Sequence, residues 1–295
     1  MSWRGPAGPT ERRAVVRVMT WNIRTGGRDR GGPDRLDQVV RVVTEQAPDV
    51  LALEELRGFD RDGLMATVAG RVGMTPHLAR SCFGQPVAVL VRPPYRVVDA
   101  GPVRRPFHHA AARAVVATSA GPLTVVGAHL YPYSGGRRRM EVDWLVSAVR
   151  RAPGPLTLIT GDLNSLDPTV DHTARLAGMP VLYRRRHLRR AGGTVDTRAI
   201  ARLLAAGLVD LWPASAPGAP EAEGLTVPTR FGGAEFAGMR LDYLFGSPAL
   251  AERVSDCRVI RGGAADTASD HYPLLAELDL DPTPREVFNA PGVRR

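Results

Sequence analysis

The chain lacks the features that mark secreted and membrane proteins. Its 295 residues include two cysteines, Cys82 and Cys257, which are too few for a disulfide framework. The first residues contain no apolar segment followed by a small-residue cleavage site, and no apolar run approaches the roughly 18 residues that a membrane-spanning helix needs. These absences predict a reduced, cytoplasmic protein with no transmembrane segment, and we expect it to be a monomer.

Lysine is absent, so the 39 basic residues are all arginines. They exceed the 30 acidic residues and give a formal net charge of +9 and a pI of about 10.6. A charge of this size favours a polyanionic partner, such as nucleic acid or an anionic lipid surface. Because the lack of lysine accompanies an abundance of Ala, Gly, Pro and Val, it also indicates a compositional bias, and the charge alone does not identify the partner.

Apolar patterning outlines one folded body, residues 14–280, as a single α/β domain between polar ends at 1–13 and 281–295 that we expect to be flexible. Short apolar runs separated by Pro- and Gly-bearing turns predict buried strands. The expected strands are 14–23, 50–53, 86–91, 110–118, 123–130, 156–160, 241–245 and 272–280. One-sided apolar stripes predict helices at 34–46, at 137–151 and from about residue 196.

Polar residues that suit catalysis recur where these strands end. They are Asn22, Glu55, His129, Asp162, Asn164, Asp242 and His271. A single Asp or Asn beyond a strand is usually a turn or cap residue, but a whole series in order indicates a site assembled at one edge of a sheet. The carboxylates suit Mg²⁺, which takes oxygen ligands and keeps several waters, whereas no Cys/His spacing indicates a zinc site. Glu55 and Asp270 are the candidate metal carboxylates.

The segment 157–165, TLITGDLNS, is the most specific of these patterns. Its apolar strand delivers Asp162 and Asn164 two residues apart, which places both side chains on the same side. A carboxylate in this position can orient a water while the amide holds a phosphate oxygen. The pattern therefore favours hydrolysis of a phosphate ester.

Six ordered segments resemble the signatures of the endonuclease/exonuclease/phosphatase superfamily, whose best-known branch is deoxyribonuclease I-like. They are TWN at 20–22, PDVLALEE at 48–55, GAHL at 127–130, GDLN at 161–164, RLDY at 240–243 and SDH at 269–271. The resemblance runs from about residue 18 to residue 278, nearly the whole folded body. It implies a four-layer α/β/β/α sandwich, in which two packed β-sheets are flanked by helices.

The resemblance also implies a metal site. Glu55 matches the metal-binding glutamate of the superfamily, and Asn22 and Asp270 would complete the metal environment. The expected cofactor is Mg²⁺, with Mn²⁺ as an alternative. Where the superfamily usually has Gln-Glu, this chain has Glu54 and Glu55. Glu54 either alters the metal preference or faces away, and we expect it to face away because adjacent strand residues point to opposite faces.

The resemblance assigns the catalytic roles as well. Asp162 and Asn164 match the pair that positions the attacking water and the phosphate. His271 matches the catalytic histidine, and Asp242 matches the carboxylate that orients it, which agrees with the way a carboxylate fixes an imidazole tautomer. His129 resembles a second histidine of the deoxyribonuclease I-like and lipid phosphodiesterase branches. Residues 128–132 lack the Asn-x-Tyr pattern of abasic-site endonucleases, so that repair role is disfavoured.

Two groups of arginines are candidate phosphate ligands. Arg113 lies on an expected strand between two of the motifs, where it is either a phosphate clamp or a surface residue. Arg184, Arg185 and Arg186 belong to the run YRRRHLRR at 183–190, which follows the GDLN motif. This run either tracks a nucleic-acid backbone or is a solvated charge run.

The remaining histidines and aromatic residues carry weaker signals. His108 and His109 fall in a Pro- and Arg-bearing turn without a partner of matching spacing, so we expect loop residues rather than metal ligands. Thr229 and Phe231 precede the Asp242 strand and either line a substrate groove or serve packing.

Together these features predict a metal-dependent hydrolase of phosphate esters that uses in-line attack by a positioned water. The first-choice substrate is nucleic acid, cleaved by a phosphodiesterase or nuclease activity. One alternative is a phosphatase or phosphodiesterase that acts on a small-molecule or lipid-headgroup phosphate ester. An alternative of another class is a catalytically silent binding protein on the same fold. The presence of every motif carboxylate and of both motif histidines disfavours this last alternative.

Overall fold

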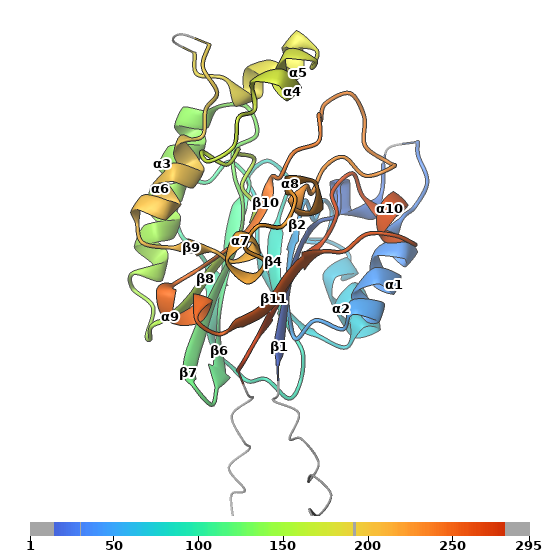
Figure 1. Ribbon diagram of the computed structural model, residues 1–295. Helices are drawn as coiled ribbons and strands as arrows, with labels where there is room; N and C mark the ends of the chain where they lie inside the picture. Colours follow the sequence, from blue (N-terminus) through green and yellow to red (C-terminus); the bar gives the residue numbers. More distant parts are fainter. Residues whose placement is uncertain (1–14, 30, 191–192, 281–295) are drawn as a thin grey trace, which may run out of the picture.

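The computed structural model describes residues 15–29, 31–190 and 193–280. They form two mixed six-stranded sheets packed face to face (Figure 1). The first sheet has the order β11-β12-β1-β2-β4-β3, with β1 (Val16–Asn22), β2 (Val50–Glu54), β3 (Thr75–Ala79), β4 (Val87–Val91), β11 (Val254–Val259) and β12 (Leu274–Leu278). The second has the order β5-β6-β7-β8-β10-β9, with β5 (Val97–Pro102), β6 (Ala110–Thr118), β7 (Gly121–His129), β8 (Leu156–Asp162), β9 (Val209–Asp210) and β10 (Asp242–Gly246).

Helices cover the outer face of each sheet, as Figure 1 shows with α1 and α2 on one side and α3 and α6 on the other. The longer helices are α1 (Leu36–Gln46), α2 (Leu64–Val72), α3 (Gly135–Val149) and α6 (Arg198–Ala205). Short turns of helix join the other elements: η1 (Thr25–Gly27), α4 (Thr173–Ala177), α5 (Val181–Arg184), η2 (Arg185–His187), α7 (Leu211–Ser215), α8 (Glu221–Gly224), α9 (Pro248–Ala251) and α10 (Ala265–Ala268). The expected α/β/β/α sandwich is confirmed.

The layers follow from the two-residue alternation of the strands. In β1, Val18 points toward the other sheet and joins the apolar core between the sheets, whereas Met19 points toward α1 and α2. In β8, Leu158 belongs to the same inter-sheet core and Ile159 packs with α3 and α6. Because central strands are buried on both faces, they appear in the sequence as continuous apolar runs.

The strands that the sequence pattern missed are the four at the sheet edges, β3, β5, β9 and β11. Edge strands are covered less completely, and every position of β5 is half-buried or exposed. Their sequences therefore contain polar residues, with proline in β3 and β5, and lack the apolar run of a central strand. The helix α2 was also missed. The expected flexible ends, 1–13 and 281–295, lie outside the described residues.

The topology brings several strand ends to one edge of the sandwich. β1 runs parallel to β2, and β7 runs parallel to β8, so their carboxyl ends lie together. β10 runs antiparallel to β8 and begins at that same edge, with Asp242 opposite Asp162. In the described part of the chain, no helix has the length and apolarity needed to cross a bilayer.

Candidate active site

The candidate site lies at the end of the inter-sheet core, where the inward-facing positions change from apolar to polar. Along β1 the inward series runs from Val18 through Thr20 to Asn22, and along β8 it runs from Leu158 to Asp162. All of these residues are buried. The alternation that builds the core thus also aims the polar side chains at one another.

His271 and Asp242 form the most closely defined pair. The Nδ1 of His271 lies 2.8 Å from Asp242 Oδ2, and both side chains are buried. The indole Nε1 of Trp21 donates to the His271 carbonyl at 2.9 Å, which holds the backbone of the histidine. Burial by itself lowers the pKa of His271, but the nearby carboxylates of Asp242 and Asp162 outweigh it and raise the pKa well above 6.5. The imidazole is therefore positively charged at neutral pH, with Nδ1–H donating to Asp242.

Asp162 faces the same histidine from β8. Its Oδ2 lies 3.8 Å from His271 Nε2 and 3.3 Å from His129 Nε2. The Nδ2 of Asn22 donates to this oxygen at 3.0 Å, and the backbone N–H of Asn164 donates to Oδ1 at 2.9 Å. Burial raises the pKa of Asp162 to about 7, against the opposing effect of His271. A carboxylate with such a pKa can exchange a proton near neutral pH.

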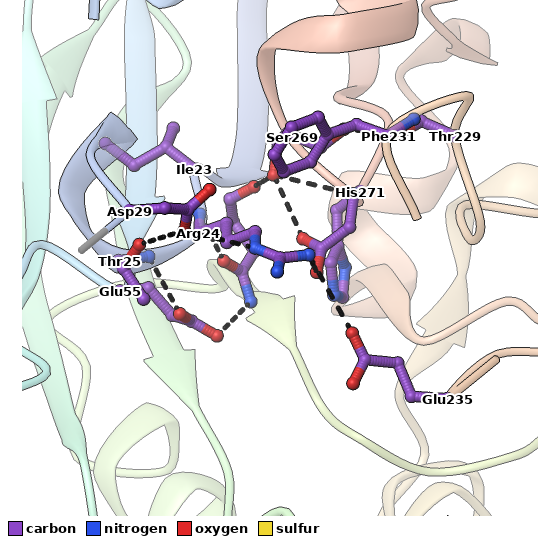
Figure 2. Close-up of polar contacts among 12 residues, drawn as sticks. Ile23, Arg24, Thr25, Asp29, Glu55, Thr229, Phe231, Glu235, Ser269 and His271 are labelled. Atoms are coloured by element: carbon purple, nitrogen blue, oxygen red, sulfur yellow. Dashed lines mark hydrogen bonds and ion pairs between the residues drawn. The ribbon is translucent and has the colours of Figure 1, made fainter. Parts of the chain in front are cut away.

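Glu55 is joined to this group through Asn22. The Nδ2 of Asn22 also donates to Glu55 Oε1, at 3.1 Å. Glu55 Oε2 accepts from the backbone N–H of Thr25 at 2.9 Å and from Gln85 Nε2 at 3.2 Å. Glu55 follows the last residue of β2 and has a left-handed backbone with φ of 57°. This turn aims its carboxylate toward Asn22, and Figure 2 shows the same carboxylate beside Thr25.

Asp270 lies beside this group but is engaged by an arginine that the sequence did not point out. The Nη1 of Arg24 lies 2.9 Å from Asp270 Oδ2. The same side chain lies between two further carboxylates, with its Nη1 3.8 Å from Glu235 and its Nε 3.4 Å from Asp29 (Figure 2). The other oxygen of Asp270, Oδ1, accepts from Ser269 Oγ at 3.3 Å. The sequence signal for Arg24 is its place two residues after Asn22.

The donor set fits a hard divalent cation. One ligand atom each of Asp162, Asp242 and His271 lies within 4.8 Å of the others. The Oδ1 of Asp242 is buried and has no hydrogen-bond partner among the described residues. Asn22 connects Asp162 of this group with Glu55, so the site is rich in oxygen atoms, which Mg²⁺ and Mn²⁺ prefer.

Glu54 does not face away from the site, contrary to expectation. Its side chain is fully buried and points between the sheets, where Oε1 accepts from the Thr20 hydroxyl at 2.9 Å. Burial and the charges of Asp242 and Asp162 raise the pKa of Glu54 well above 4.5. Adjacent side chains of β2 do point to opposite faces, with Leu53 toward the helices and Glu54 toward the other sheet. The face between the sheets is the one that carries the site.

His109 is likewise closer to the site than expected for a loop residue. It is 8% exposed, and its ring stacks on His129 with centroids 4.0 Å apart and an interplanar angle of 20°. Burial lowers the pKa of His109 to about 2 and that of His129 to about 3, so both rings are neutral. The contact arises because Ala110, the next residue, pairs with His129 across β6 and β7.

Asn164 reaches the group by a turn rather than by strand alternation. β8 ends at Asp162, and Asn164 has φ of 49°, a conformation that asparagine tolerates. Its Nδ2 donates to the Leu130 carbonyl at 3.1 Å. Gly161 has φ of 131° and packs so tightly that any Cβ would overlap the carbonyl of Ala128. The GDLN motif therefore needs its glycine for close approach of β7 and β8.

The predicted arginines lie outside this group. Arg113 pairs with Asp99 on the outer surface of β6 and β5, and the structure does not bring it to the cluster. Arg185 lines a surface cavity, and the Arg186 guanidinium lies over the ring of Tyr133 at 5.3 Å.

Of the remaining candidates, Thr229 donates to the Ser269 carbonyl beside the site. Phe231 packs under Arg24, with its ring centroid 4.9 Å from the guanidinium carbon. Arg184 extends toward the Ala177 carbonyl at 3.4 Å on the exposed side of α5.

Comparison with known proteins finds one family and many similar folds. The model of the Endonuclease/Exonuclease/phosphatase family matches residues 19–271. The fold resembles an AP endonuclease from Archaeoglobus fulgidus, with a TM-score of 0.67 and 21% identity over 90% of this chain and 99% of that chain. It also resembles truncated Caenorhabditis elegans TDP2, with a TM-score of 0.62 and 21% identity over 90% and 97% of the two chains.

A third similar structure is D. rerio TDP2 complexed with single strand DNA product, with a TM-score of 0.64 and 16% identity over 90% of this chain and 98% of that chain. No curated protein sequence matches the chain. At these identities the likeness to solved structures establishes the fold.

Proposed function

Because the chain belongs to the endonuclease/exonuclease/phosphatase family and is therefore a phosphoric ester hydrolase, we propose that it is a Mg²⁺-dependent phosphodiesterase that hydrolyses nucleic acid. The observation that carries this proposal is the buried His271–Asp242 pair, whose Nε2 faces Asp162 at 3.8 Å. A positive imidazole and a carboxylate of raised pKa thus converge on one point at the mouth of the sandwich. This pairing suits attack of water on a phosphate ester.

Each residue of the site has a separate role in the proposed reaction. Asp162, held by Asn22 and by the Asn164 amide, accepts a proton from the attacking water. The water oxygen forms a bond to phosphorus as the bond to the leaving ester oxygen breaks on the opposite side, and the leaving oxygen keeps the electron pair and takes up a proton from solvent. His271 donates a hydrogen bond from Nε2 to a phosphate oxygen on which negative charge develops. Asp242 keeps the imidazole charged and oriented through Nδ1.

Glu55 and Asn22 would hold the cation, with Mn²⁺ as a substitute for Mg²⁺. Asp270 would join them only by giving up its ion pair with Arg24. When bound, such a cation neutralises charge on the phosphate and stabilises the transition state. The fit is supported by the carboxylate oxygens of Glu55 and Asp162, which Asn22 joins through its side-chain amide.

Nucleic acid is supported as the substrate by the net charge of +9, which arginine alone provides. A basic surface raises the local concentration of a polyanion and supplies bidentate donors for phosphate. The similar fold of a TDP2 structure that contains a single strand DNA product is consistent with this choice.

The test is a hydrolysis panel with the full chain, using plasmid DNA, single-stranded DNA, RNA, inositol phosphates and a phosphodiester lipid. We expect polynucleotide cleavage with added Mg²⁺ and none in excess chelator. Cleavage of only the inositol phosphates or the lipid would overturn the proposal that nucleic acid is the substrate. Undiminished cleavage in chelator would overturn the metal dependence, and binding without cleavage of any member would indicate a silent protein.

A further inference from the structure

A surface cavity of about 900 Å³ lies next to the amino end of α3 and is lined by arginines. Five of them contribute to its wall: Arg137, Arg185, Arg189, Arg190 and Arg198. Among the described lining residues Asp196 is the only acid, and it is already paired with Arg198. We call this feature the arginine cavity. Its charge suits a ligand with more than one phosphate group.

The helix α3 adds to the positive field of the cavity. It is 15 residues long, and Gly135 and Gly136 of its first turn line the cavity. The preceding Ser134 makes no side-chain cap hydrogen bond, and the Asp196 carboxylate packs against Gly135 in that turn. The N–H groups at a helix start favour anions, and Asp196 is the anion that the chain itself places there.

A row of aromatic rings connects the arginine cavity with the candidate active site. Tyr133 lines the cavity, and its ring centroid lies 5.6 Å from that of Tyr131. The ring centroids of Tyr131 and His108 lie 4.7 Å apart, and those of His108 and His109 lie 4.6 Å apart. The ring of His109 stacks on that of His129 with centroids 4.0 Å apart. We call these five residues the ring ladder. Since His129 contacts Asp162 at 3.3 Å, the ladder runs without a break from the catalytic group to the cavity.

The outer part of the ladder presents aromatic surface to solvent. Phe83 stacks on His108 with centroids 4.3 Å apart and is 63% exposed. Tyr133 is 57% exposed. Single exposed apolar side chains are common, but Phe83 and Tyr133 both contact His108 and so form one exposed aromatic cluster, which is typical of a binding surface. Their position beside arginines favours a ligand that carries both flat rings and phosphates.

A buried carboxylate holds the two segments of the ladder together. Glu141 of α3 is fully buried, and its two oxygens accept from the backbone N–H of His108 at 2.9 Å and of Tyr131 at 2.7 Å. This arrangement fixes the ladder before any ligand arrives. A preformed stacking surface loses little entropy on binding.

We propose that the ring ladder, with Phe83, and the arginine cavity bind one single-stranded segment of nucleic acid. Its bases stack on the exposed rings, and its phosphates enter the cavity. Paired bases of a duplex are stacked on one another and cannot reach such rings, whereas every unpaired base offers a flat face. This inference rests on the proposed function, because it names the form of nucleic acid that reaches the same site.

The binding test measures fluorescence anisotropy of a labelled oligothymidylate and of a duplex of equal length, in chelator so that no cleavage occurs. We expect tighter binding of the single strand. Phe83→Ala and Tyr133→Ala should each weaken single-strand binding at least about 5-fold, as expected for loss of a stacked base. Their effect on the duplex should be smaller.

The charge test uses Arg185→Ala together with Arg189→Ala. The plot of log affinity against log salt should become shallower by about 0.7 for each phosphate that the variant no longer neutralises. The matched control is Arg104→Ala together with Arg105→Ala, which removes the same charge from a different surface cavity, near Arg113. Equal changes of slope in both double variants would show only a general charge effect and would overturn the assignment of the cavity.

Hydrolysis of bis(p-nitrophenyl) phosphate separates this inference from the proposed function, because that small diester carries no bases to stack. If it is cleaved but single-strand binding is no tighter than duplex binding and is unaffected by loss of the rings, the inference is wrong and the diesterase chemistry stands. If oligothymidylate binds through the rings but no diester is cleaved, the inference holds and the proposed activity fails.

Discussion

His271 owes its charge and its orientation to the carboxylates that face it. Asp242 holds Nδ1 at 2.8 Å, and Asp162 lies 3.8 Å from Nε2. All three side chains are buried, so these charges interact with little screening by water. Removing one member therefore changes the chemistry of the others.

The first prediction concerns Asp242 and His271 as a unit. His271→Ala should lower turnover by about 10²- to 10⁴-fold, the usual range for a positioned general acid or base. Asp242→Asn should also cost turnover, because it leaves the imidazole without its orienting charge. The double variant should be within a few-fold of the worse single variant, since Asp242 acts through His271. Multiplicative losses with unchanged circular dichroism would mean that the two residues act independently.

The second prediction concerns the buried Glu54, whose pKa is raised well above 4.5, first by burial. Because the folded state disfavours its ionised form, the wild type should lose stability as the pH rises above about 4.5, at up to about 1.4 kcal/mol per pH unit until the folded-state pKa is passed. Glu54→Gln should escape this loss. The advantage of the variant in urea unfolding should therefore grow with pH.

Its matched control is Glu45→Gln on α1, which changes an exposed glutamate. A pH-independent difference between wild type and Glu54→Gln would show that Glu54 is not held in its neutral form. Turnover should change little, because glutamine keeps an acceptor for the Thr20 hydroxyl.

At the level of helices and strands, the eight central strands could be predicted and the four edge strands could not. Burial on both faces makes a central strand such as β8 a run of apolar residues up to its functional end at Asp162. The motif residues could be located because they end such runs. By contrast, the stacking of His109 on His129 depends on the register of β6 against β7, which joins distant segments. The residues around His109 in the sequence do not indicate that β6 pairs with β7 in this register.

Arg24 illustrates a second limit on prediction at this scale. Its ion pair with Asp270 links residues 246 apart in the sequence. The turn after β1 aims this side chain, with Arg24 itself at φ of 48°. Only the assembled sheet brings the two together.

The third prediction tests the close approach of β7 and β8. Gly161→Ala should destabilise the fold by more than about 3 kcal/mol, because alanine is strained at φ of 131° and its Cβ would overlap the Ala128 carbonyl. Gly101→Ala on β5 is the control, since open space surrounds an added Cβ there. It should change stability by less than about 0.5 kcal/mol. Similar unfolding midpoints for the two variants would show that the tight packing at Gly161 is not required.

On the scale of the whole molecule, the two sheets share one core, and the candidate active site lies at the open end of that core. Glu55 and Asn22 come from the first sheet, whereas Asp162 and Asp242 come from the second. The contact of Asn22 with both Glu55 and Asp162 is a direct link between the sheets. The ordered motifs pointed to these residues in the sequence. The position of Glu54 near Asp242 and Asp162 could not be predicted, because it depends on how the two sheets pack.

The most direct test of a metal-dependent site is the rate of single-stranded DNA hydrolysis during a Mg²⁺ titration from excess chelator, with wild type and Glu55→Gln. Wild type should be inactive in chelator and should recover fully with Mg²⁺. Glu55→Gln should need at least about 10-fold more Mg²⁺ for its half-maximal rate, because it loses a proposed ligand. The exposed Glu252→Gln should match wild type. Full activity of wild type in chelator, or an unchanged Mg²⁺ requirement in Glu55→Gln, would contradict a cation held by Glu55.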